Sequence, residues 1–273
     1  MKPQHVGNVL FACGALGLTP PATFLEPCWR ASAEIMGSFK LQELTNALYA
    51  AAKLDIRPPD YWLHEFSRVF EVLLPDSCQQ DLANTALGLA TLALWELPLW
   101  PLLWTGLWQS LPRDFASWDA DCRLLAQQLY QVYQAAKLEQ SGLPEPDPVL
   151  LAAVRKCWTD QVQGSSKLHE EVSAALKRMG VAHTNEHWCE RSERGIDIAI
   201  EGDSPIAMEV DGPSHFLLDG RQDGSTLLRN RMLTSNGWRV VIVDYRVWQQ
   251  QLKTNQEHEN YLRNLLSGVG AHP

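Results

Sequence analysis

The chain has 273 residues, of which 45% are hydrophobic and 20% charged, the composition of an ordinary soluble globular protein long enough for two domains. A formal net charge of -9 argues against indiscriminate binding to a polyanion, because such binding needs many Lys and Arg residues. Any contact with nucleic acid must therefore use local basic patches. The six cysteines are scattered without a Cys-x-x-Cys pair, which favours reduced intracellular thiols over disulfides or a zinc site.

The N-terminal half is a repeat array with a constant period, set by the equal spacing of Asn8, Asn46 and Asn84. Each of these asparagines is followed eight positions later by a leucine: Leu16, Leu54 and Leu92. A fourth copy has Gln127 in place of the asparagine and arrives slightly later than the period requires, as a short insertion would cause. The sequence therefore predicts four related units between residues 1 and 160.

Each unit contains two stretches with the apolar spacing of a helix, separated in the first two units by Pro20-Pro21 and Pro58-Pro59. Proline is tolerated in the first turn of a helix and not in its middle, so each break ends one helix and starts the next. Helix pairs of this size stack into one continuous core with a long concave surface, which usually binds a partner. We expect the recurring asparagines to bond backbone across the junctions between units, because residues that read different bases should vary.

The apolar stretch from residue 87 to 107 is interrupted by Glu96, Pro98 and Pro101, so no transmembrane helix is predicted. The eleven tryptophans are expected mainly to fill gaps between stacked helices, with a minority available to stack on bases. The N-terminus lacks a signal or transit sequence and enters a repeat almost at once. We expect either a cytosolic protein or, since arrays normally begin with an atypical polar unit, the C-terminal part of a longer one.

A second domain is predicted from about residue 161, where the pattern changes at Gly164-Ser165-Ser166. Ser166 is the expected N-cap of its first helix, which Gly180 ends. Three short strands, a helix, a strand that is apolar on both faces and a final helix should follow, at residues 181–188, 196–200, 206–210, 226–235, 239–243 and 247–266.

Three carboxylates fall together in this pattern: Asp197 in the second strand, and Glu209 and Asp211 at the end of the third. Glu209 and Asp211 point to one face because strand side chains alternate. If the second and third strands form a hairpin, Asp197 lies near both. Such a cluster requires a divalent metal or arginine partners, for which Arg229 and Arg231 are candidates. The alternative is that Asp197 and Asp211 bond backbone amides at strand ends.

The run from Ile206 to Phe216, which contains Glu-Val-Asp-Gly-Pro-Ser-His-Phe, resembles the RAP domain. The Gly237-Trp238 pair and the spacing of Tyr245 and Trp248 extend the resemblance, which covers about residues 166 to 250. The repeating units of the N-terminal half, with Pro-Pro-x-x-Trp-Leu at 58–63, resemble octotricopeptide (OPR) repeats. The combination implies a nucleus-encoded chloroplast or mitochondrial protein that binds organellar transcripts and governs their processing, stability, splicing or translation.

The RAP domain is in turn similar in topology to PD-(D/E)xK nucleases, whose αβββαβ order matches the predicted elements. The resemblance places Asp197 and Glu209 as ligands of Mg²⁺, but Asp211 stands where the activating lysine should be. Asp211 could act as a third ligand or as a general base. Catalysis by Asp197, Glu209 and Asp211 is therefore the alternative to RNA binding alone.

Three further residues are candidates for contact with RNA. His215 follows the turn formed by Gly212 and Pro213 and could donate to a phosphate, or serve a structural role. Arg229 and Arg231 could contact phosphates, or cover Asp211 or Asp244 as ion pairs.

The sequence thus predicts an N-terminal α-solenoid of OPR-like helix pairs at 1–160, an αβββαβ restriction-endonuclease-like RAP domain at 161–250, and a C-terminal helix and tail at 251–273. The expected function is binding of single-stranded organellar RNA, together with other proteins of an RNA-processing complex. The alternatives are a Mg²⁺-dependent endoribonuclease and a protein-interaction scaffold that touches no RNA, which the acidic charge favours.

Overall fold

The computed structural model describes residues 3–139, 141–160 and 166–270. The chain divides into two compact units, one of Met1–Gln161 with Leu217–Leu228 and one of Val162–Phe216 with Arg229–Pro273. We call them the helical unit and the sheet unit. Gly164 and Ser165, where the sequence predicts the start of the second domain, lie outside the described residues.

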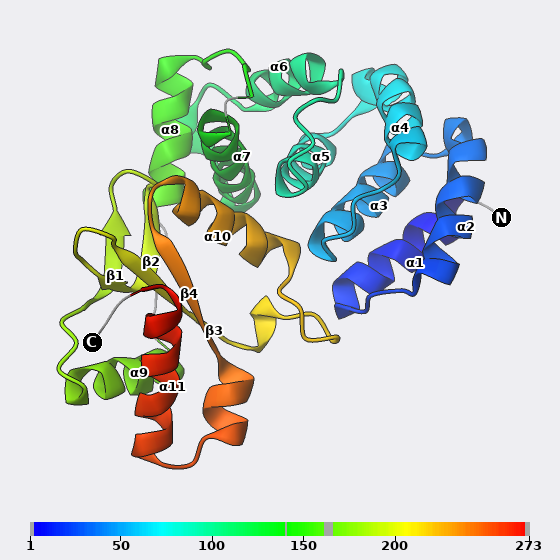
Figure 1. Cartoon of the computed structure of the whole chain (residues 1–273). Coiled ribbons are helices and arrows are strands. Elements are labelled where there is room, and N and C mark those ends of the chain that lie inside the picture. The colour runs from blue at the N-terminus through cyan, green and yellow to red at the C-terminus, as the bar shows by residue number, and fades with distance from the viewer. Residues whose placement is uncertain (1–2, 140, 161–165, 271–273) are drawn as a thin grey trace. The chain divides into compact units, whose positions relative to one another are not determined.

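Helices account for the whole regular structure of residues 3–160 (Figure 1). The first helices of three units start at equal intervals, which confirms the sequence period as one of structure: α1 (Pro3–Leu16), α3 (Leu41–Lys53) and α5 (Gln79–Thr91). Their partners and the last pair are α2 (Ala22–Glu34), α4 (Asp60–Leu73), α6 (Trp100–Ser110), α7 (Ala120–Leu138) and α8 (Pro148–Thr159). Short 3₁₀ turns, η1 (Met36–Ser38), η2 (Leu74–Asp76) and η3 (Phe115–Ser117), join some of them.

The proline breaks act as predicted. Pro21 is the N-cap of α2 and Pro59 that of α4, and both have extended backbone dihedrals that end the preceding turn. The segment from 87 to 107 is likewise divided between α5 and α6. Within the described residues, no helix is long and apolar enough to cross a membrane.

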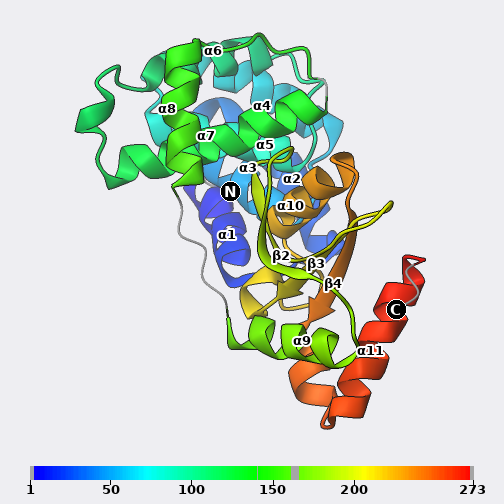
Figure 2. The ribbon, with the colours of Figure 1, turned by 90° about the vertical axis from the view of Figure 1, so that its left-hand side faces the viewer.

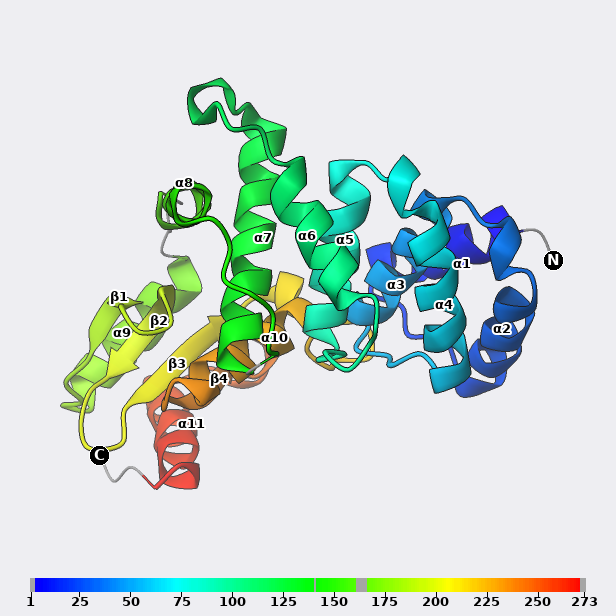
Figure 3. The same ribbon diagram turned by 90° about the horizontal axis from the view of Figure 1, so that it is seen from above.

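The first helices of successive units pack directly on one another, α1 on α3, α3 on α5 and α5 on α7 (Figure 3). Small residues allow this close approach: an added Cβ on Gly14 would lie 2.9 Å from the Cα of Ala50. Aromatic rings pack between the second helices of the units, as predicted for the tryptophans. Trp62 meets Trp29 edge to face at 5.1 Å and stacks on Phe66 at 5.3 Å.

The sheet unit contains a four-stranded mixed sheet in the order β1-β2-β3-β4: β1 (Thr184–Cys189), β2 (Arg194–Ile200), β3 (Ile206–Asp211) and β4 (Arg239–Asp244). β1, β2 and β3 are antiparallel neighbours, and β4 runs parallel to β3. The helices are α9 (Lys167–Arg178), α10 (Gly224–Ser235) and α11 (Asn255–Gly268), with the 3₁₀ turn η4 (Pro213–His215) after β3 and the π-helical turn η5 (Arg246–Gln251) after β4. The order α-β-β-β-α-β confirms the predicted succession of elements.

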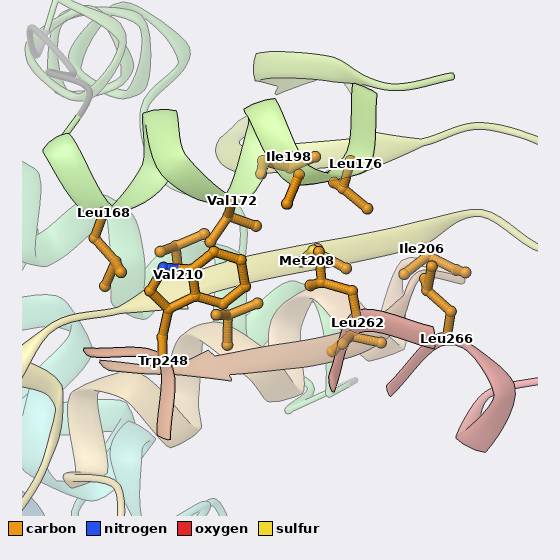
Figure 4. Packing of buried hydrophobic residues seen from close by; sticks show 13 residues of the cluster. Leu168, Val172, Leu176, Ile198, Ile206, Met208, Val210, Trp248, Leu262 and Leu266 are labelled. Carbon is orange, nitrogen blue, oxygen red and sulfur yellow. The ribbon is translucent and has the colours of Figure 1, made fainter. Parts of the chain in front are cut away.

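The main core of the sheet unit lies between the sheet and helices α9 and α11, which contact each other at a wide angle (Figure 2). Figure 4 shows Val172 and Leu176 of α9 facing Met208 of β3, with Trp248 and Leu262 closing the core from η5 and α11. A smaller cluster on the opposite face includes Leu233 of α10. Since α11 supplies part of the main core, we place the C-terminal helix in the same domain as the sheet.

Two predicted boundaries were wrong. The single helix expected over 247–266 is two elements, because Thr254 caps a new helix by accepting from the N–H of Glu257. The first strand begins at Thr184 rather than at residue 181, because Val181 still closes α9 through a hydrogen bond from its N–H to the Leu176 carbonyl. Ser166 is the N-cap of α9 as predicted, accepting from the N–H of His169 at 3.2 Å.

Candidate functional site

The carboxylates at the end of β3 are buried beneath α10. Glu209 is 2% exposed and Asp211 0%, and both lie on the sheet face that α10 covers, as alternation along the strand predicts. Two buried carboxylates need compensation by positive charge or by hydrogen-bond donors.

Arg229 of α10 supplies that compensation. Its Nη1 lies 3.2 Å from Oε2 of Glu209, and its Nη2 donates to Oδ1 of Asp211 at 2.8 Å. Its Nε and Nη2 also donate to the side chain of Asn230. The Arg229 side chain is 16% exposed. Of the two roles considered for Arg229, ion pairing with the carboxylates is the one this geometry supports, whereas Asp244 pairs with Arg246 at 2.6 Å.

Asp197 accepts a hydrogen bond from a backbone amide, which is the alternative to metal binding that the sequence left open. Its Oδ2 accepts from the Val210 N–H at 2.7 Å. The pairing of β2 with β3 ends at Ile198 opposite Met208, so the Asp197 side chain takes the place of the next main-chain acceptor. The hairpin brings Asp197 close enough to Glu209 that their charges interact.

His215 lies at the margin of this cluster. His215 is 36% exposed, with Nδ1 3.6 Å from Oδ1 of Asp211, at the end of a turn in which its N–H bonds the Gly212 carbonyl. Arg231 is half-buried on α10. The structure therefore brings Asp197, Glu209, Asp211, His215 and Arg229 together; we name these residues the carboxylate cluster.

A second arginine, which sequence reasoning missed, borders the carboxylate cluster. Arg194 opens β2 and is 8% exposed. Burial, together with the charge of Arg229, lowers the pKa of Arg194 to about 10 although Glu209 raises it. Burial raises the pKa of Glu209 to about 8, against the opposing effect of Arg229. The run Glu190-Arg-Ser-Glu-Arg194 is typical of an exposed turn. The one signal of burial was that Arg194 stands two residues before Ile196, so both side chains point to the same face of the strand.

The cluster does not fit the Mg²⁺ ion implied by the nuclease resemblance. A cation bridging Glu209 and Asp211 would meet the guanidinium that already lies within 3.2 Å of both carboxylates. Asp197 has committed one oxygen to the β3 backbone. With Asp211 in place of a lysine, the residues present are those of a charge-compensated structural cluster.

Comparison with known proteins agrees with this part of the fold. Residues 208–265, from β3 through most of α11, match the RAP domain family. A RAP domain is therefore present in this chain. The "RAP domain-containing protein, chloroplastic" of Oryza sativa subsp. japonica is 26% identical over 195 residues, which are 69% of this chain and 30% of that protein. The chain thus spans less than a third of the length of this curated relative.

The motif residues of the RAP domain are mostly structural here. Trp248 is 2% exposed in the main core and donates from Nε1 to Glu171 of α9 at 3.2 Å. Gly237 has a φ of +90°, which lets the chain turn from α10 into β4. These residues fix the positions of α9, η5 and β4 in the sheet unit.

Proposed function

We propose that this chain is an organellar RNA-binding protein that acts in post-transcriptional control, with its helical unit as an OPR-type solenoid that contacts single-stranded RNA. The RAP domain supports an RNA-associated role, and the name of the rice relative supports an organelle. The observation that carries the proposal is the pairing of a RAP domain with helix pairs that repeat at a constant interval. We infer a role in transcript processing, stability, splicing or translation.

The first helices of the repeats carry candidate RNA contacts, and on α3 the Tyr49 and Lys53 side chains line a pocket together with Asp223. Asn8, Asn46 and Asn84 are at least partly exposed there, and Gln80 donates to Asn84 at 2.7 Å within α5. This bond lies within one helix, whereas the sequence predicts a bond across the junction. Positions three residues after each asparagine lie on the same helix face and differ between repeats: Phe11, Tyr49 and Leu87.

Variation between repeats at these positions is what recognition of different bases by successive repeats requires. A varying aromatic or aliphatic residue can stack on the face of a base and so distinguish one repeat from the next, which a constant residue cannot do. Positions seven residues after each asparagine vary as well, and include Lys53 for a phosphate. On the RAP domain we retain His215 and Arg231 as candidate RNA contacts. Arg229 is committed to the carboxylates.

An affinity selection tests the proposal. The purified chain is mixed with a random single-stranded RNA pool at low and at physiological salt, and retained RNAs are sequenced. We expect an enriched short motif, and at least tenfold weaker binding of that motif by Tyr49→Ala/Lys53→Ala. The control Tyr61→Ala removes an exposed aromatic from α4 and should bind as the unmodified chain does. Absence of RNA retention even at low salt would contradict the proposal and leave the scaffold, which the charge of -9 favours.

A further inference from the structure

A group of side chains outside the carboxylate pair of β3 has the composition of a metal site. His169, Glu186 and Asp197 come from α9, β1 and β2 of the RAP domain, and one potential ligand atom of each lies within 4.8 Å of the others. Nothing in the proposed RNA binding uses His169 or Glu186. We propose that these three residues bind one divalent transition-metal ion, of the class of Zn²⁺ or Mn²⁺.

The distances suit a common ion. Nδ1 of His169 and Oε1 of Glu186 are 3.0 Å apart. Two adjacent ligands at bond lengths of about 2.0–2.2 Å on one ion are separated by about 2.8–3.6 Å, depending on whether the geometry is octahedral or tetrahedral. Asp197 uses Oδ2 for the Val210 N–H, and its Oδ1 takes no part in that bond. One Asp197 ligand atom lies within 4.8 Å of those of His169 and Glu186, which places Asp197 as the third ligand.

The His169 ring is deeply buried beside Glu186. Its side chain is 3% exposed, and its Nε2 is a buried atom with no hydrogen-bond partner in the described part of the chain. Native proteins rarely leave a buried polar atom without a hydrogen-bond partner. An ion bound through Nδ1, the nitrogen that faces Glu186, would leave the ring proton on Nε2.

Local backbone geometry explains why Glu186 reaches this position. The register of β1 and β2 pairs Asn185 with Ile198 and His187 with Ile196, but leaves Glu186 and Asp197 out of the ladder. Glu186 has a φ of +50°, in the left-handed region that glycine favours. The break places the two carboxylates and the α9 histidine together, and the Glu186 side chain, 32% exposed, leaves a path to solvent.

The ligand set selects the class of ion. A nitrogen ligand favours Zn²⁺, Mn²⁺ and related transition metals, whereas Mg²⁺ and Ca²⁺ prefer oxygen ligands alone. Three protein ligands leave at least one position for water. The bound ion would join α9 to the β1–β2 hairpin, so its first consequence is stabilisation of the RAP domain.

Calorimetric titration of the full chain, stripped of metal with a chelator, tests the site. We expect one Zn²⁺ or Mn²⁺ ion per chain, a melting temperature that rises with the ion, and no comparable effect of Mg²⁺ or Ca²⁺. Glu186→Gln and Asp197→Asn should each weaken binding at least tenfold. Glu201→Gln is the matched control, because Glu201 lies 3.9 Å from His187 on the same hairpin but outside the site.

Cobalt substitution separates this site from the cysteines. Bound Co²⁺ should show weak visible bands without thiolate charge transfer, and Glu186→Gln should abolish them while its circular dichroism stays that of the unmodified chain. No saturable binding, equal binding by Glu186→Gln and Glu201→Gln, or a thiolate band that survives both substitutions would overturn the proposal. These outcomes are independent of RNA binding, which is measured separately.

Discussion

Arg229 donates a hydrogen bond of 2.8 Å to Asp211, a carboxylate with no exposed surface, and thereby ties α10 to the end of β3. The same guanidinium compensates Glu209. The guanidinium occupies the space that a cation bridging Glu209 and Asp211 would need. The carboxylate cluster therefore stabilises the fold, and we propose that more exposed residues contact RNA.

Loss of this arginine should destabilise the RAP domain strongly. Arg229→Met leaves Glu209 and Asp211 buried without their cation, and breaking a buried pair costs about 3–5 kcal/mol. Hydrogen exchange of the β3 amides measures this, because it reports on the domain locally. The control Arg263→Met removes an exposed arginine 3.8 Å from Glu259 and should change little. Equal, small effects of the two substitutions would contradict the role of Arg229.

The stability of the RAP domain should fall as pH rises from about 4.5 to about 8. Burial raises the pKa of Glu209 from its usual 4.5 to about 8, so the folded chain holds a proton that the unfolded chain releases. The resulting stability is fully present below pH 4.5 and is lost as pH passes through 8. Glu209→Gln should remove this pH-dependent part of the stability. The protection of the β3 amides from hydrogen exchange, corrected for intrinsic exchange rates, should then depend on pH differently in the variant and in the unmodified chain. Parallel pH profiles would contradict the shifted pKa.

Trp248 should be among the most sensitive positions of the domain. Trp248→Ala removes a ring that is 2% exposed in the main core, at a cost of about 3–5 kcal/mol. Trp248→Phe keeps most of the packing and loses mainly the bond to Glu171, worth about 1 kcal/mol. Denaturant unfolding of both variants, monitored by hydrogen exchange of the β3 amides, tests whether the alanine variant is the less stable of the two. An alanine variant no less stable than the phenylalanine variant would refute it.

The close packing of α1 on α3 predicts a sharp contrast between neighbouring positions. Gly14→Leu forces a side chain into the backbone of α3, where even a Cβ would come within 2.9 Å of Ala50. We expect a loss of about 1–3 kcal/mol or local release of α1. Ala12→Leu places the same side chain on an exposed position of the helix and should be nearly neutral. Exchange rates of the α1 and α3 amides distinguish them, and equal rates in both variants would contradict the packing.

The repeat and the order of elements could be predicted because both depend on local signals. Apolar spacing, paired prolines and evenly spaced asparagines define the helix pairs, and Ser166 and Gly180 mark the ends of α9. The final helix was misjudged because apolar spacing continues through residues 247–266. The capping residues Thr254 and Glu257 were the signal that it breaks.

The candidate sites could be predicted only in part, because the pairing of charged residues that are far apart in the sequence depends on tertiary structure. Alternation along β3 placed Glu209 and Asp211 on one face, but it could not choose between a metal and Arg229 as their partner. Arg194 and His169 are charged or polar residues in segments that read as solvent-exposed, yet both are buried. Glu186 reaches its position through a left-handed backbone conformation at a residue other than glycine, for which the sequence has no signal.

The most direct test of the central claim is ultraviolet cross-linking of the purified chain to its selected RNA, with cross-linked peptides identified by mass spectrometry. RNA binding through the helical repeats predicts cross-links in peptides from α1, α3, α5 and α7, with Phe11 and Tyr49 as preferred sites. The cross-link at position 49 should be lost in Tyr49→Ala. An RNA that binds specifically but cross-links to none of these helices, or a chain that binds no RNA, would contradict the claim.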